Sequence, residues 1–156
     1  MCQYCGCQEI TTIGTLMDEH ILIRNHCGDT RRCVEHGDVA GAVEHVRLLR
    51  ALMQPHNAVE EGGLYLSMLR FEEYEPQTAR LYDEHDDLDA AIDAALEAAD
   101  AGKSDQIDWR GLIAEFEVLY EHIQREDNGL FPAAAVMLDA EDWERCERLR
   151  GHTHPA

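Results

Sequence analysis

The sequence predicts an all-α protein, an up-down-up-down four-helix bundle with a short fifth helix and a cysteine-rich N-terminal tail. Four long segments carry apolar residues at helical spacing. Proline is scarce, with four residues in the chain, and no run of β-branched residues alternates with polar ones. The breaks between the four segments are short, which makes neighbouring helices antiparallel.

The four predicted helices follow one another between three breaks that are rich in glycine, proline and polar residues. Each helix is recognised by one apolar face. These faces extend from Ile13 to Cys27, from Val46 to Gly63, from Leu81 to Leu96 and from Leu112 to Leu130, and the breaks lie at residues 37–38, 74–76 and 101–104.

A fifth, shorter helix is predicted near the C-terminus. Asp139 is a suitable N-cap, and Asp142 follows it by three residues, as in a capping box. We therefore expect a cysteine-rich tail over residues 1–9, a bundle over residues 10–138, and a short helix and tail over residues 139–156. A chain of 156 residues is expected to have one core.

The charge argues against several classes of partner. The chain has 32 Asp and Glu against 13 Lys and Arg, a formal net charge of −19. This charge opposes binding to nucleic-acid phosphates and to anionic membrane surfaces. The longest apolar run, Ala133 to Leu138, is far shorter than the roughly 20 residues of a membrane span, and no signal peptide is visible. We expect a cytoplasmic protein.

An internal repeat interrupts the apolar faces with polar residues. Each predicted long helix carries one histidine on its apolar face, and the second and fourth carry a glutamate four residues later. The tripeptide Asp-Glu-His recurs after 65 residues, and His-x-x-x-Glu recurs after 66, continuing in both copies to glycine, leucine and an aromatic residue. The six residues are His20, His56, Glu60, His85, His122 and Glu126.

These six side chains have the chemistry of a metal site. Residues four apart lie on one helix face, about 5.4 Å apart along the axis, so each His-Glu pair can point at one place. Four imidazoles and two carboxylates in a bundle interior are costly unless they are paired or bound to metal. Two cations with two histidines each and two bridging glutamates would keep open coordination positions, which is typical of a reactive site.

Residues around this pattern carry two further expectations. Gly63 and Gly129 each follow a glutamate of the pattern by about one turn, where a missing side chain would leave room near the metals. The remaining histidines are expected to be solvated or to support the ligands. They are His26, His36, His45, His152 and His154.

The pattern resembles the hemerythrin-like (HHE cation-binding) family over about residues 10–138. The stretch EDNGLFP, from Glu126 to Pro132, is similar to the fourth-helix signature of that family. The resemblance implies a non-haem centre of two iron ions with an oxo or hydroxo bridge and two carboxylate bridges. It implies that His20 and His56 bind one iron, that His85 and His122 bind the other, and that Glu60 and Glu126 bridge them.

One position departs from the oxygen carriers of this family. They have a further histidine one turn before the third-helix histidine, where this chain has Leu81. Tyr82 and Asp89 both lie near the face of His85 and are candidates to fill the gap. The alternatives are that Tyr82 is a core aromatic residue and that Asp89 is an exposed charge.

The absence of that histidine favours redox chemistry over reversible oxygen carriage. The leading interpretation is a protein of stress defence that binds or reacts with O2, peroxide or nitric oxide, with an electron donor as a further partner. Two alternatives remain open. One is a module that senses or stores iron or oxygen without turnover, and the other is a thiol-assisted factor that repairs iron clusters.

The cysteines form a second feature of the sequence. Cys2, Cys5 and Cys7 precede the first helix, and a Cys-x-x-Cys turn brings two sulfurs together with the third close by. In an up-down-up-down bundle, Cys146 can approach this tail. We expect the tail thiols to lie over the metal end and to serve redox chemistry or gating rather than a separate zinc site. The alternative is that they are incidental.

Overall fold

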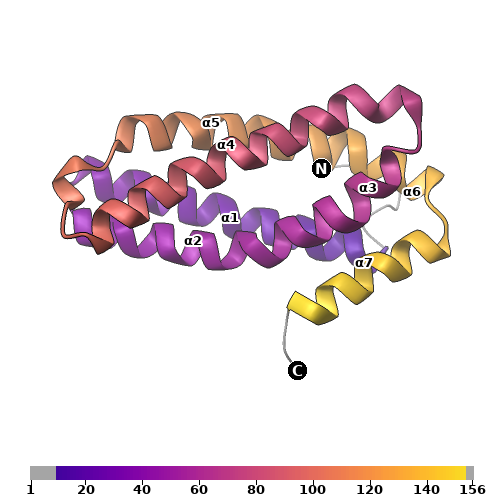
Figure 1. Cartoon of the computed structure of the whole chain (residues 1–156), viewed down its shortest axis with the longest axis horizontal. Coiled ribbons are helices and arrows are strands. Elements are labelled where there is room, and N and C mark those ends of the chain that lie inside the picture. The colour runs from indigo at the N-terminus through magenta and orange to yellow at the C-terminus, as the bar shows by residue number, and fades with distance from the viewer. Residues whose placement is uncertain (1–9, 154–156) are drawn as a thin grey trace.

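The computed structural model of the protein describes residues 10–153. Within this range the chain forms helices joined by short turns, and no strand occurs (Figure 1). The prediction of an all-α helical bundle is therefore confirmed. The long helices are α1 (Thr11–Glu35), α2 (Val39–Val59), α4 (Glu75–Asp100) and α5 (Trp109–Arg125).

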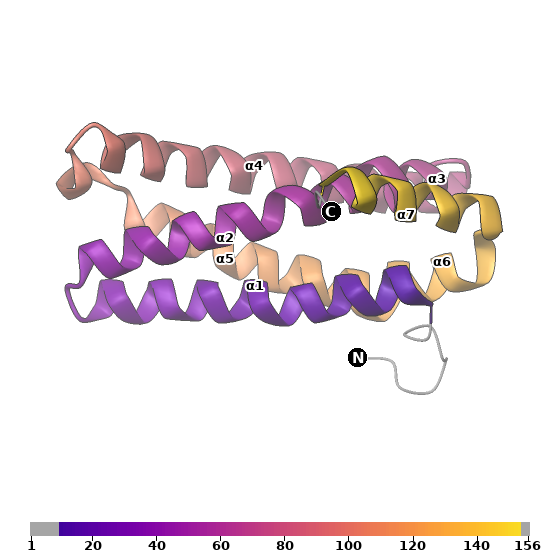
Figure 2. The same ribbon diagram turned by 90° about the horizontal axis from the view of Figure 1, so that it is seen from below.

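The four long helices alternate in direction and close into a bundle. The turn from α1 to α2 and the turn from α4 to α5, which contains η4 (Ser104–Gln106), lie at the left end of Figures 1 and 2. Gly37 and Gly102 in these turns have φ of 72° and 73°, the left-handed region that favours glycine. α1 and α4 each pack against both α2 and α5.

The connection from α2 to α4 differs from the prediction. α2 continues as a π-helical segment, η2 (Glu60–Tyr65), and a last turn, α3 (Leu66–Met68), before a 3₁₀ turn, η3 (Glu72–Tyr74). The predicted break at residues 74–76 is therefore too late. Pro76 lies in the first turn of α4, where its missing N–H has no helical partner to lose.

The end of α5 has the same construction as the end of α2. α5 continues as a π-helical segment, η5 (Glu126–Leu130), and then as α6 (Phe131–Met137). The sequence analysis expected regular helix at both places. A π-helix hydrogen-bonds residue i to i+5 and frequently occurs at functional sites. Both π-helical segments begin at a glutamate of the repeated pattern.

The predicted fifth helix is α7 (Ala140–Thr153). Its start is a reciprocal cap, because the Asp142 N–H donates to Asp139 Oδ1 and the Asp139 N–H donates to Asp142 Oδ2, both at 3.1 Å. From this start the helix folds back along α2 and η2, as Figure 2 shows. α7 therefore covers the part of the bundle in which η2 interrupts the regular helix.

Gly63 in η2 makes this close packing of α7 possible. A Cβ on Gly63 would lie 2.6 Å from Cys146 Sγ and 3.3 Å from Cys146 Cα. A Cβ on Gly129 would have no atom from outside its own helix within 4 Å. The expectation that these glycines leave room beside the metals is corrected for Gly63, because the space that it leaves is filled by α7.

Gly63→Ala should destabilise the protein, although alanine favours helix over glycine by about 1 kcal/mol. The new methyl group would overlap the Cys146 sulfur, and overpacking of this kind costs roughly 1–3 kcal/mol. Cys146→Ala removes the sulfur, so the double variant should recover most of the loss. Urea unfolding of the two single variants, the double variant and the wild type measures this coupling. Gly129→Ala is the matched control, and strictly additive losses would contradict the packing.

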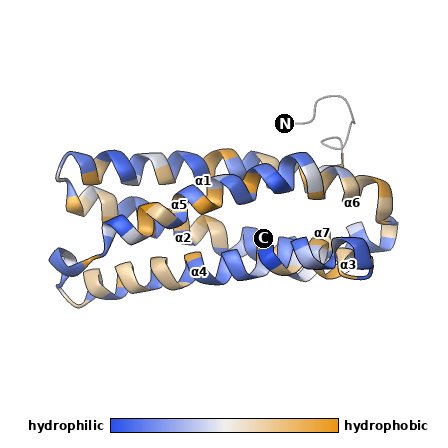
Figure 3. Ribbon diagram, turned by 90° about the horizontal axis from the view of Figure 1, so that it is seen from above, coloured by the Kyte–Doolittle hydropathy of each residue, from blue (hydrophilic) through white to orange (hydrophobic). Residues whose placement is uncertain are grey.

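Two apolar clusters fill the bundle, one on each side of a polar layer. The cluster beside α6 contains Leu16, Leu81 and Phe131, and the other contains Cys27 and Leu49. Figure 3 shows that apolar and polar residues alternate along the ribbons of the long helices, as expected when each helix buries one face. No helix of the described part of the chain is long and apolar enough to cross a membrane.

Candidate metal centre

The six predicted side chains come together in the polar layer between the two apolar clusters. α1, α2, α4 and α5 each supply one histidine, and η2 and η5 each supply the glutamate with which the segment begins. All six residues are at most 2% exposed. They are His20, His56, Glu60, His85, His122 and Glu126.

The four histidines form two pairs. The ring centroids of His20 and His56 lie 4.8 Å apart, and those of His85 and His122 lie 4.7 Å apart. Each pair combines one helix with the next along the chain. The pairing is therefore the one that the resemblance implied for two separate ions.

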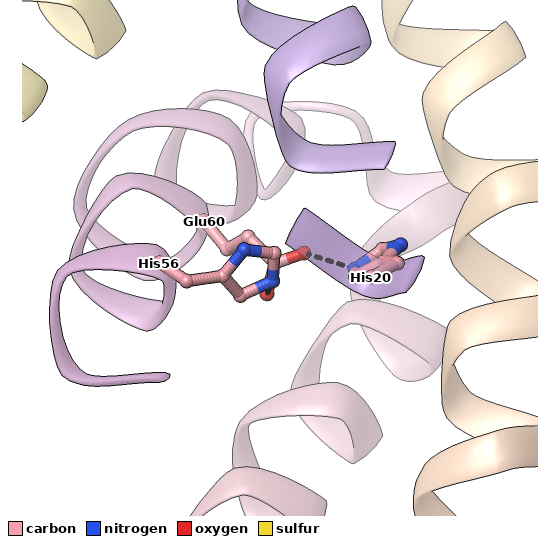
Figure 4. Close-up of side chains that lie close together, drawn as sticks. All are labelled: His20, His56 and Glu60. Atoms are coloured by element: carbon pink, nitrogen blue, oxygen red, sulfur yellow. Dashed lines mark ion pairs between the residues drawn. The ribbon is translucent and has the colours of Figure 1, made fainter. Parts of the chain in front are cut away.

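Glu60 lies between the two histidine pairs. Its Oε1 is 3.1 Å from His56 Nε2 and 3.4 Å from His85 Nε2. Its Oε2 is 3.4 Å from His20 Nε2, the contact that is drawn as a dashed line in Figure 4. One carboxylate therefore faces imidazole nitrogens of both pairs.

Glu126 has the equivalent position in the second half of the repeat. Its Oε1 is 3.4 Å from His20 Nε2 and 3.1 Å from His122 Nε2. Both glutamates thus reach both histidine pairs, and the imidazole Nε2 atoms and the carboxylate oxygens converge on one small volume.

The atoms that face this volume fit a cation. Both carboxylate oxygens of Glu60, Oε1 of Glu126 and Nε2 of His20 are buried without a hydrogen-bond partner. Burial of such atoms is costly unless a positive charge compensates them. Imidazole nitrogen and carboxylate oxygen are ligands that divalent transition metals accept. The ligand atoms of His20, His56 and Glu60 all lie within 4.8 Å of one another, and so do those of Glu60, His85 and His122.

Each of the four imidazoles also donates its outward Nδ1–H to a carboxylate. Such a hydrogen bond fixes the tautomer and the ring orientation, so that Nε2 points inward with its lone pair free for a metal. The four bonds join His20 to Asp127 at 2.8 Å, His56 to Glu19 at 3.2 Å, His85 to Glu61 at 3.1 Å and His122 to Glu84 at 3.1 Å.

These four carboxylates link the four long helices in a ring, because each one bonds the histidine of a neighbouring helix. Glu19 precedes His20 on α1 but bonds the histidine of α2, and Glu84 precedes His85 on α4 but bonds the histidine of α5. Glu61, the second residue of η2, bonds the histidine of α4, and Asp127, the second residue of η5, bonds the histidine of α1. The sequence analysis missed this role. Its signal was the acidic residue beside the ligand in every copy of the repeat.

Three arginines extend the carboxylate network outward, and one of them, Arg80 of α4, forms an ion pair with Glu84 Oε2 at 3.6 Å. Arg150 of α7 donates to both oxygens of Glu19, at 3.1 and 3.2 Å. Arg125 of α5 donates to both oxygens of Glu84, at 2.8 and 2.6 Å. Arg150 uses two nitrogens, and such a bidentate pair holds a carboxylate in one orientation, whereas Arg125 donates to both oxygens from Nη2 alone. α7 therefore contributes to the order of the site as well as to the packing of η2.

The electrostatics of the cluster keep its carboxylates ionised. Burial raises the pKa of Glu60, but the charge of His56 and the close imidazole nitrogens of His20, His56 and His85 lower it more, so that it lies well below its ordinary value. Burial lowers the pKa of His85, whereas Glu60 and Glu61 raise it further, to about 10. In the absence of metal, protons on the imidazoles therefore take the place of the cation.

Tyr65 is the functional candidate that the sequence analysis missed. Its buried hydroxyl donates to Glu126 Oε2 and lies 3.3 Å from His122 Nε2, and its ring stacks on His85 with centroids 5.6 Å apart. Burial and the charges of the nearby glutamates raise the pKa of Tyr65 well above its ordinary value. Tyr65 follows Glu60 by five residues, and the π-helical backbone keeps both on one face.

The repeat contained a signal for Tyr65. The equivalent aromatic residue of the second copy is Phe131, which stacks on His20 with centroids 5.6 Å apart. Both aromatic rings therefore cover a histidine of the cluster, and only the first copy carries a hydroxyl. The difference between tyrosine and phenylalanine at matching positions of the repeat marks the asymmetry of the site.

Tyr82 and Asp89 do not reach the cluster. The Tyr82 hydroxyl donates to the backbone carbonyl of Glu61 at 2.7 Å, and its ring contacts Tyr65 edge-on. Asp89 is exposed on α4. Leu81, at the position of the missing histidine, is buried in the apolar cluster beside α6. The polar side chain beside His85 is therefore neither Tyr82 nor Asp89 but Tyr65, which comes from η2 rather than from α4.

The thiol prediction lies mostly outside the described residues. Cys2, Cys5 and Cys7 belong to residues 1–9, so their arrangement stays a prediction. Cys146 is fully buried against Gly63, and burial raises the pKa of its thiol to about 11. A buried protonated thiol is a poor nucleophile and a poor ligand. Cys146 would have to leave this packing before it joined the tail.

Asp127→Ala should weaken metal binding, because His20 loses the carboxylate that orients its ring. Loss of an outer-shell partner typically costs about 10–100-fold in metal affinity. The matched control is Asp18→Ala, which removes an equal charge from an exposed position on α1 beside the same site. Competition with a chelator of known affinity measures the difference, and equal losses in the two variants would contradict the orienting role.

The fold and the site together define a helical-bundle protein with a buried His/Glu cation-binding cluster. The model of the hemerythrin HHE cation binding domain matches residues 11–134, and the chain belongs to this family. Comparisons with curated proteins and with solved structures gave no match.

Proposed function

We propose that this protein holds two iron ions in the cluster and uses them to bind or reduce O2, peroxide or nitric oxide. The observation that carries the proposal is the pair of three-residue ligand groups that share Glu60. His20 and His56 would hold one ion, and His85 and His122 would hold the other. Glu60 and Glu126, each of which faces both pairs, would bridge them.

The charge of the cluster supports more than one cation. Two glutamates face inward, four carboxylates bond the imidazoles, and three arginines pair with these carboxylates. With neutral imidazoles, the formal charge of these six carboxylates and three arginines is −3. A single divalent cation would leave a net charge of −1, which is uncompensated in a buried site.

The size of the site supports metal ions. The space between the six side chains is too small for a water molecule, and its lining includes Ile23, Met53 and Leu119. An ion fits such a volume and an organic substrate does not. Bound iron would supply redox chemistry on a diatomic molecule or peroxide. The apolar wall would keep bulk water out, and the Tyr65 hydroxyl would hold a proton beside Glu126.

The proposal is tested by metal analysis and optical spectroscopy of the full chain before and after addition of peroxide. We expect two irons per chain and a spectrum that changes with peroxide. Catalysed disproportionation of peroxide would proceed without an electron donor, whereas its reduction would need one, so the assay is run with and without a reductant. A single ion with tetrahedral, closed coordination would contradict the proposal.

The same measurements separate the alternatives. A ligand-dependent conformational change without turnover would favour a sensing or storage module. Iron transfer to a damaged cluster that fails when Cys2, Cys5 and Cys7 are all replaced would favour the thiol-assisted repair factor. A cytoplasmic location belongs to the proposal and is tested by fractionation of cells.

Tyr65→Phe should change the spectrum of the iron-loaded protein and its rate with peroxide. The variant removes the hydroxyl that contacts Glu126 and His122 and keeps the ring that stacks on His85. Tyr82→Phe is the matched control, because the Tyr82 hydroxyl bonds only a backbone carbonyl among the contacts described above. Identical spectra and rates for Tyr65→Phe and wild type would exclude a role for this hydroxyl.

A further inference from the structure

A second cluster of metal-ligand side chains lies outside the buried centre, on α1 and α2. Nδ1 of His26 and Nδ1 of His45 are 3.3 Å apart, and Asp29 Oδ2 is 3.9 Å from His45 Nδ1. The ligand atoms of these three residues all lie within 4.8 Å of one another. His26 and His45, which were expected to be solvated or to support the ligands, are both half-buried and face each other.

The helical hairpin places these residues together. Asp29 and His45 each lie eight residues from Gly37, on opposite sides of the turn between α1 and α2, so they are at the same level of the bundle. His26 precedes Asp29 by three residues and therefore lies on the same face of α1. All three side chains are half-buried, so solvent reaches the cluster.

We propose that His26, Asp29 and His45 form a second cation site, for a divalent transition metal of the Zn²⁺ class. In tetrahedral coordination with Zn–N bonds of about 2.0–2.1 Å, two ligand nitrogens lie about 3.3–3.4 Å apart. The separation of the two Nδ1 atoms, 3.3 Å, matches this geometry. Water would complete the coordination, because three protein ligands leave one tetrahedral position open.

The third ligand needs a small movement that its surroundings permit. Asp29 Oδ2 is 3.9 Å from His45 Nδ1, somewhat more than the tetrahedral spacing. The Asp29 side chain is 34% exposed, so there is room for it to rotate toward the histidines. Its other oxygen accepts a hydrogen bond from Arg32, an exposed side chain. Arg32 therefore competes with the cation for Asp29, and its removal should favour binding.

The alternative is a hydrogen bond between two neutral imidazoles, in which one Nδ1–H donates to the other Nδ1. That arrangement would need no metal and no contribution from Asp29. The two interpretations differ in the effect of Arg32 and in the response of the rings to Zn²⁺. Neither difference depends on the identity of the metals in the buried centre.

The test is a Zn²⁺ titration of the full chain by calorimetry, with His26→Ala and His45→Ala compared with the wild type. We expect each variant to bind one equivalent of Zn²⁺ less than the wild type, because the buried centre is the same in all three proteins. His36→Ala is the matched control, since His36 is exposed at the end of α1 and its ring bonds the Arg32 carbonyl. It should bind as many equivalents as the wild type.

A second variant separates a metal site from a histidine pair. Arg32→Ala should bind the additional Zn²⁺ several-fold more tightly, because Asp29 loses its competing partner. Nuclear magnetic resonance of the wild type should show the His26 and His45 ring signals shift together with this equivalent of Zn²⁺. Equal stoichiometry in wild type, His26→Ala and His45→Ala, or ring signals that do not respond to Zn²⁺, would overturn the proposal.

Discussion

Glu60→Ala and Glu126→Ala are each expected to retain less metal than His20→Ala. Each glutamate faces both histidine pairs, whereas His20 belongs to one. Removal of one member of a buried charge cluster costs about 3–5 kcal/mol, because the remaining charges lose their compensation. Elemental analysis of metal per chain after dialysis compares the three variants.

The matched control for this comparison is Glu121→Ala. Glu121 is exposed on α5 and directly precedes His122, so it tests the loss of one negative charge near the site without the loss of a bridge. Its metal content should equal that of the wild type. Equal metal content in Glu60→Ala, Glu126→Ala and His20→Ala would contradict the bridging assignment.

Metal binding should release protons, and the apparent affinity should rise with pH. The imidazoles of the metal-free protein have raised pKa values, about 10 for His85, because carboxylates surround them. A metal must displace these protons before it can bind Nε2. Each displaced proton makes the apparent affinity rise about tenfold per pH unit, up to the pKa of the imidazole.

Calorimetric titrations in two buffers of different ionisation enthalpy measure this proton release directly. The metal-free protein should also lose stability as pH rises from 6.5, the ordinary pKa of histidine, to about 10, the pKa of His85, because in this range folding requires the ring to take up a proton. Bound metal should remove this loss. Affinity that is independent of pH between about 6 and about 8 would contradict protonated imidazoles in the metal-free site.

Much of the site could be read from the sequence because the repeat is regular. Histidine and glutamate four residues apart must share a helix face, and two matching copies place four histidines at one level of an antiparallel bundle. The six inward side chains were predicted on this basis, and the structure brings them together. The cap at Asp139 and Asp142 was also predictable, since its hydrogen bonds are local.

The features that were missed depend on the backbone or on contacts between distant residues. The π-helical segments η2 and η5 have no signal in a 3.6-residue period, so the helical pattern did not place Tyr65 on the same face as Glu60. Tyr82 and Asp89 were proposed as replacements for the missing histidine because their positions on the helix place them near the face of His85. Tyr65 comes instead from the helix beside it, which a register argument does not consider.

The sequence by itself determined the helical class, the repeat and the inward histidines and glutamates, because these follow from spacing along a single helix. Only the tertiary structure decided which carboxylate orients which histidine. Each such bond crosses from one helix to another, as from Glu19 on α1 to His56 on α2. It also decided that Gly63 makes room for α7, since the atom it would meet lies 83 residues further along the chain at Cys146. Contacts between helices depend on how the helices pack, which the local pattern does not specify.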